Sequence, residues 1–101
     1  MSEFVKVAQV SDLQPGAGKV VMVKDRAIAL FNVDGTFYAI DNICLHRGGP
    51  LGEGELEGCV VTCPWHGWQY DVKTGTSETN PATKVKTYEV KTEDSAVMVS
   101  V

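Results

Sequence analysis

The chain has 101 residues, of which 44% are hydrophobic and 22% are charged, and its formal net charge is −4. This length suits one domain with a modest core, and the composition is that of a globular protein rather than a disordered one. The acidic balance argues against nucleic acid as a partner, because phosphate binding requires a basic surface. No signal peptide and no apolar stretch of roughly 20 residues is present, so we expect a soluble, cytoplasmic monomer outside the membrane.

The first half of the chain contains four runs rich in β-branched or aromatic residues, which predict short strands. They are Phe4–Val10, Lys19–Val23, Ala27–Val33 and Thr36–Ile40. Asp34 and Gly35 lie between the last two runs and are typical of a tight hairpin. Residues 11–13 can open one helical turn, which Pro15 and Gly16 end.

The second half predicts four more strands, again with turn residues between them. They are Cys59–Thr62, Trp68–Val72, Val85–Val90 and Ala96–Val101, the last two forming a hairpin around residues 92–95. No segment has a sustained helical period. Many short strands at close spacing predict an all-β fold, an antiparallel sandwich or small barrel.

Two short sequences carry the specialised chemistry, Cys44-Leu45-His46 and Cys63-Pro64-Trp65-His66. Sixteen residues separate His46 from Cys63, and both histidines and two of the three cysteines of the chain lie in these sequences. Each offers one thiolate and one imidazole, and a glycine follows each histidine. Two thiolates and two imidazoles make a complete four-ligand set for a metal centre.

This pattern, with Pro64, Gly67 and Trp68 beside it, resembles the binding motif of Rieske [2Fe–2S] proteins, in particular the free-standing ferredoxins. The resemblance implies that Cys44 and Cys63 bind one iron of a [2Fe–2S] cluster and that His46 and His66 bind the other.

The resemblance also implies how the single domain, residues 1–101, is divided. A β scaffold is expected over residues 1–41 and 82–101, with a small cluster-binding subdomain over residues 42–81. Residues 78–82 would then be a proline-containing loop over the cluster, or a plain surface loop.

A structural zinc site of the Cys₂His₂ type is the alternative for these four residues, and it would make the chain an interaction module. Zinc fingers pair Cys-x-x-Cys with His-x₃₋₅-His, which is not the spacing here. A Cys–His hydrolase lacks a third group to orient the histidine. Cys59 is expected to be a reduced core residue of its strand, with a ligand or redox role as the alternative.

The residues around the motif predict a low reduction potential. Histidine ligation removes negative charge from the centre, which gives Rieske centres about −150 to +300 mV against about −400 mV for plant-type ferredoxins. High-potential Rieske proteins carry an extra disulfide and a serine, and these positions here are Gly49, Trp65 and Trp68. Tyr70 remains as a donor to a cysteine sulfur. We expect a potential near the bottom of the Rieske range.

Rieske oxygenases also need a mononuclear iron held by two further histidines and a carboxylate. Both histidines of this chain are already in the motif, so it is expected to be an electron carrier and not the oxygenase. The expected partners are a flavin-dependent ferredoxin reductase and a terminal oxygenase. The alternative is the small Rieske-like subunit of an assimilatory nitrite reductase.

The expected docking surface consists of the residues around the imidazoles, since electrons must leave through an exposed group. They are Leu45, His46, Arg47, Trp65 and His66. Glu53, Glu55 and Glu57 are close in sequence to the first motif and would either steer a basic partner or form an ordinary solvated edge.

Overall fold

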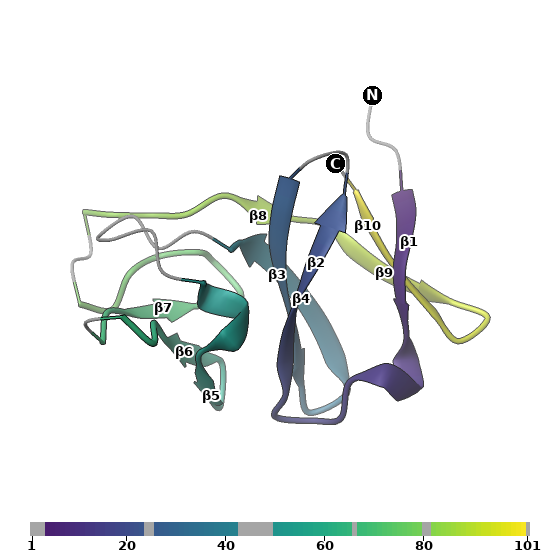
Figure 1. Ribbon diagram of the computed structural model, residues 1–101, viewed down its shortest axis with the longest axis horizontal. Coiled ribbons are helices and arrows are strands. Elements are labelled where there is room, and N and C mark those ends of the chain that lie inside the picture. The colour runs from purple at the N-terminus through teal and green to yellow at the C-terminus, as the bar shows by residue number, and fades with distance from the viewer. Residues whose placement is uncertain (1–3, 24–25, 43–49, 66, 80–81, 101) are drawn as a thin grey trace.

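The computed structural model of the chain describes residues 4–23, 26–42, 50–65, 67–79 and 82–100. Its strands pair antiparallel in three sheets, so the predicted all-β fold is confirmed (Figure 1). Within the described ranges the helical elements are two 3₁₀ turns, η1 (Val10–Asp12) and η2 (Leu51–Glu53). None of the helices in these ranges has the length and hydrophobicity to span a membrane.

The three sheets follow one another along the molecule (Figure 1). The sheet at one end has the order β1 (Phe4–Gln9), β10 (Ala96–Ser100) and β9 (Val90–Glu93). The central sheet has the order β2 (Gly18–Val23), β3 (Arg26–Val33), β4 (Thr36–Asp41) and β8 (Thr87–Tyr88). The sheet at the other end has the order β5 (Glu55–Glu57), β6 (Val60–Thr62) and β7 (Gln69–Asp71).

Strand β3 is buried on both faces and separates two hydrophobic cores. Side chains alternate along a strand, so Ile28 and Leu30 point to one core, and Ala29 and Phe31 to the other. The first, the scaffold core, joins the central sheet to the β1-β10-β9 sheet. The second, the ligand-side core, joins the central sheet to η2 and the β5-β6-β7 sheet, and its buried members are Ala29, Phe31, Ile40, Leu51, Val61, Cys63, Tyr70, Val72 and Val85.

The first four predicted strands are confirmed to within two residues at each end. The β3–β4 hairpin turns at Asp34 and Gly35, whose φ angles are 51° and 94°. Two successive positive φ values are the geometry for which Asp-Gly is favoured in a two-residue hairpin. The predicted helical turn is also present, as η1, and it ends β1 at Gln9.

The prediction of one strand over Val85–Val90 is wrong. Strand β8 covers only Thr87–Tyr88 and pairs with β4, whereas β9 starts at Val90 and pairs with β10. The chain passes between two sheets at Glu89, whose carbonyl accepts a hydrogen bond from the Ser100 N–H at 2.9 Å. Strand β5 and turn η2 were not predicted, and Cys59 lies in the turn before β6 rather than in the strand.

Tyr88 fixes the end of β4 through two side-chain hydrogen bonds. Its hydroxyl donates to Asp41 Oδ1 at 2.6 Å and accepts from Arg26 Nη1 at 3.1 Å. Burial, and then the bond to Asp41, raises the pKa of Tyr88 above its ordinary value of 10.0. Because the pKa of Tyr88 is higher in the folded protein than in the unfolded one, the protonated hydroxyl contributes its full stabilisation at any pH below the pKa of the unfolded protein. This contribution is lost as the pH rises through the pKa of the folded protein.

Replacing Tyr88 with phenylalanine is therefore expected to cost about 1 kcal/mol of unfolding free energy at pH 8, because the two hydrogen bonds are lost. The difference between wild type and Tyr88→Phe should narrow above pH 10, where only the wild type loses the contribution of Tyr88. Denaturant unfolding of both proteins between pH 8 and pH 11 measures this. A difference that stays constant over that interval would show that the Tyr88 hydroxyl does not titrate in this way.

Candidate metal centre

The hairpin between β6 and β7 holds Cys63 in a closed turn. Cys63 directly follows β6, and its backbone N–H donates to the Trp68 carbonyl at 2.7 Å. The Gly67 N–H donates back to the Cys63 carbonyl at 3.2 Å, with Gly67 at a φ of +77°. That left-handed conformation suits glycine and allows the chain to return to β7. The position of the Cys63 backbone is thus set by the sheet.

The Cys63 side chain is buried in the ligand-side core, with only 1% of its surface exposed. Its Sγ lies 3.6 Å from the Trp65 carbonyl oxygen, to which the thiol donates a weak hydrogen bond. The thiol therefore sits on a rigid hairpin, at the edge of an apolar environment. This fits iron ligation, because the fold fixes the position of the sulfur and shields it from water.

The other three predicted ligands, Cys44, His46 and His66, lie outside the described residues. The structure does describe where the segment with Cys44 and His46 leaves and rejoins the fold. It leaves after β4 at Asn42 and rejoins at η2, where the Leu51 N–H donates to the Asn42 carbonyl at 2.6 Å.

Gly54 lets the end of the segment that contains Cys44 and His46 lie against the start of the segment that contains Cys63 and His66. A Cβ added at Gly54 would overlap the backbone carbonyl of Thr62, the residue before Cys63. Leu51 is fully buried in the same core as Cys63. The two segments that carry the four predicted ligands are therefore anchored to one core, although they lie apart in sequence.

The aromatic residues near Cys63 divide into buried and exposed ones. Tyr70 is fully buried in the ligand-side core, and Trp68 packs partly buried against it. Trp65 has 51% of its surface exposed, although it lies only two residues from a buried thiol. An exposed indole at this position is available to a partner protein.

Glu53, Glu55 and Glu57 are exposed, as both alternatives for them require, a charged surface that steers a basic partner or an ordinary solvated edge. Glu55 and Glu57 flank Leu56, which packs against the ligand-side core, and β5 is an edge strand. Glu57 also shares a hollow of about 260 Å³ with Glu78, which is distant in sequence and was not predicted to lie near it. The other residues that line it are Val60, Thr62 and Gln69.

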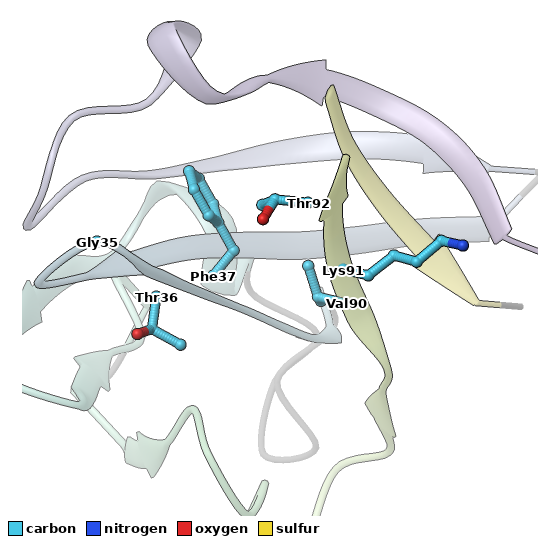
Figure 2. A pocket seen from close by; sticks show the side chains of 6 residues that line it. All are labelled: Gly35, Thr36, Phe37, Val90, Lys91 and Thr92. Carbon is cyan, nitrogen blue, oxygen red and sulfur yellow. The ribbon is translucent and has the colours of Figure 1, made fainter. Parts of the chain in front are cut away.

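Figure 2 shows a second hollow, of about 220 Å³, on the scaffold between the start of β4 and β9. Its lining residues are Gly35, Thr36, Phe37, Val90, Lys91 and Thr92. None of them is a predicted ligand, and they lie in β4, the turn before it and β9, outside the β5-β6-β7 sheet (Figure 1). This hollow therefore contributes nothing to the predicted metal site.

Comparison with known proteins identifies the family. Residues 3–89 match the Rieske [2Fe-2S] domain. The chain is 39% identical over 97 residues to the ferredoxin component of the naphthalene 1,2-dioxygenase/salicylate 5-hydroxylase systems of Ralstonia sp., covering 95% of this chain and 93% of that protein.

Solved structures agree with this assignment. A chain in the complex of reduced oxygenase and oxidized ferredoxin in carbazole 1,9a-dioxygenase superposes with a TM-score of 0.88 at 34% identity, covering 96% of this chain and 92% of that one. A candidate NADH-dependent nitrite reductase small subunit from Mycobacterium tuberculosis gives a TM-score of 0.92 at 21% identity, covering 100% and 96%, and shares the fold.

The predicted donor set of two cysteines and two histidines and the family match over residues 3–89 favour iron–sulfur chemistry over a structural zinc site. The chain belongs to the Rieske [2Fe-2S] domain family, and its cofactor is a Rieske-type [2Fe–2S] cluster.

Proposed function

We propose that the chain carries single electrons from a flavin-dependent ferredoxin reductase to a terminal oxygenase. The observation that supports this most directly is the match, over nearly its whole length, to ferredoxin components of dioxygenase systems. Such components are electron-transfer subunits rather than oxygenases. The two histidines of the chain are both in the motif, which leaves none for the mononuclear iron of an oxygenase.

We assign Cys44 and Cys63 to one iron and His46 and His66 to the other. A [2Fe–2S] cluster held in this way supplies reversible one-electron transfer. The part of the protein is to place the ligands and keep water away. Cys63 does both, because its backbone is held by the β6–β7 turn and its side chain is enclosed by the ligand-side core.

The proposal also covers the subdomains of the chain, its location in the cell and its oligomeric state. We assign residues 42–81 to a cluster-binding subdomain, because all three strands of the β5-β6-β7 sheet fall within them. Residues 1–41 and 82–101 form the scaffold. We propose a cytoplasmic monomer that does not bind membranes. The acidic net charge supports the further proposal that it does not bind nucleic acid.

The nitrite reductase alternative is supported by the fold, since a nitrite reductase small subunit superposes well at 21% identity. The curated relatives at 35–42% identity are ferredoxins of aromatic dioxygenase systems or close analogues of them. The higher identity favours an oxygenase as the electron acceptor.

Trp65 gives the test of this function. With the reductase and terminal oxygenase of a naphthalene 1,2-dioxygenase system, the protein is expected to support NADH-dependent hydroxylation of the aromatic substrate. Trp65→Ala should raise the concentration of ferredoxin needed for half-maximal rate about tenfold, as for an aromatic hot spot. The absorption spectrum of the cluster should stay unchanged.

Val10→Ala is the matched control, because Val10 is also an exposed apolar side chain but lies in η1, away from the β5-β6-β7 sheet (Figure 1). It should leave the half-maximal concentration within about twofold of wild type. Equal effects of the two substitutions would exclude Trp65 from docking. A wild-type protein that is reduced but passes no electrons to the oxygenase would contradict the proposed acceptor.

A further inference from the structure

Asn42 connects the two ends of the segment that contains Cys44 and His46. Its carbonyl accepts the Leu51 N–H at 2.6 Å, and its side-chain Oδ1 accepts the Gly52 N–H at 2.7 Å. Its own N–H donates to the Ala27 carbonyl on β3 at 3.3 Å. The residue is buried, with 8% of its surface exposed. One buried side chain thus ties the point where the segment leaves the fold to the point where it rejoins it.

The rejoining end is also fixed by close packing on β2. A Cβ added at Gly52 would lie 2.7 Å from Val20 Cγ2, 2.9 Å from the Lys19 carbonyl and 3.0 Å from Asn42 Oδ1. Only glycine lets η2 lie this close to the strand, and this closeness brings the Gly52 N–H to the Asn42 side chain. The hydrogen bond and the packing therefore depend on each other.

The leaving end is fixed by the residue before Asn42. The Asp41 N–H donates to the Lys86 carbonyl at 2.9 Å, and the Asp41 carboxylate accepts from Tyr88. Asn42 thus lies between a strand end held by hydrogen bonds and a turn, η2, that packs closely on β2. A side chain that loses Oδ1 would leave the buried Gly52 N–H without its acceptor, and of the two hydrogen bonds between the ends only the one from the Leu51 N–H to the Asn42 carbonyl would remain.

We propose that Asn42 is a positioning residue for the Rieske cluster: its side chain sets the spacing between the two ends of the first ligand segment. It does this without touching the metal. The inference rests on the proposed assignment of Cys44 and His46 as ligands. Because the same η2 adjoins β6 through Gly54, the spacing also sets how the first segment lies relative to Cys63.

Asn42→Leu removes the acceptor and keeps the branched shape of the side chain, and Asn42→Asp keeps the acceptor. Asn32→Leu is the matched control, because Asn32 is also buried, at 3% exposure, and its Oδ1 also accepts a backbone N–H, that of Gly35, at 2.7 Å. Asn32 lies on the β3–β4 hairpin, which carries no predicted ligand. If Asn42→Leu does not fold, Asn42→Ala removes the acceptor with less bulk.

The measurements use the cluster-loaded protein. They are cluster release to an iron chelator by visible circular dichroism, amide exchange over residues 51–54, and the EPR spectrum of the reduced form. Asn42→Leu is expected to release the cluster and exchange these amides about tenfold faster than wild type, with a broadened EPR spectrum. Asn42→Asp should stay within about threefold of wild type, since it keeps the acceptor.

Asn32→Leu should lower the unfolding temperature. When each protein is measured at the same number of degrees below its own unfolding temperature, Asn32→Leu should release the cluster at the wild-type rate. The positioning role is overturned if Asn42→Leu behaves as Asn32→Leu does in release rate, exchange and EPR spectrum. A wild-type protein without a [2Fe–2S] spectrum would overturn the ligand assignment as well. A normal wild-type spectrum with an unaffected Asn42→Leu would overturn the positioning role alone.

Discussion

Replacing Cys63 with alanine is expected to give a protein that retains at least about tenfold less iron than wild type. Changes to groups that only support a ligand already cost about 10–100-fold in metal affinity, and Cys63 is itself a proposed ligand. Water cannot take the place of the thiolate, because the Cys63 side chain is 1% exposed and enclosed by the ligand-side core. Iron content per chain and the visible spectrum after anaerobic reconstitution measure the effect.

Cys59→Ala is the control for this prediction. Cys59 is the remaining cysteine of the chain and packs, partly buried, against the same core. Its thiol lies outside the motif, so the variant should bind the wild-type amount of iron with an unchanged spectrum. The opposite result, in which Cys59→Ala loses the cluster and Cys63→Ala keeps it, would refute the ligand assignment.

Gly54→Ala is expected to have the largest effect on stability, about 3 kcal/mol of unfolding free energy, the upper end of the cost of overpacking. The added Cβ would overlap the Thr62 carbonyl and would lie 3.1 Å from Val61 Cγ2. The φ of Gly54 is −78°, which any residue adopts, so the cost is steric. Relief requires η2 and β6 to move apart, which would also disturb the turn that holds Cys63.

Denaturant unfolding of Gly54→Ala and Gly58→Ala separates this steric cost from the conformational cost of losing glycine. A Cβ at Gly58 meets nothing within 4 Å, but its φ is +63°. Gly58→Ala should therefore cost only about 1 kcal/mol, the penalty of a left-handed backbone. If Gly54→Ala is no more destabilising than Gly58→Ala, the close approach of Gly54 to Thr62 does not limit the fold.

The parts of the fold that local pattern determines were predictable. Strand β3 is a continuous apolar run because both of its faces are buried, and the Asp34-Gly35 turn has the φ angles that this pair favours. The exchange of sheets at Glu89 was not predictable, because β-propensity indicates a strand without naming its partner. Strand β5 was also missed, since it owes its conformation to pairing with β6 rather than to its own residues.

The candidate site shows the same division. The ligand types and spacing are local in sequence and indicated the cluster, but only the structure shows that Cys63 is buried in a core shared with Leu51. The role of Asn42 could not be predicted, because its hydrogen bond to Gly52 is made only when η2 packs on β2. A single asparagine before a cysteine motif carries no such signal by itself.

The EPR spectrum of the anaerobically reduced protein tests the central claim most directly. A Rieske cluster with two cysteine and two histidine ligands predicts a rhombic [2Fe–2S] signal with the low average g value of mixed ligation. A redox titration on the same sample should place the midpoint near the bottom of the Rieske range, about −150 mV. A colourless, EPR-silent protein that contains one zinc ion would contradict both the cofactor and the electron-transfer function.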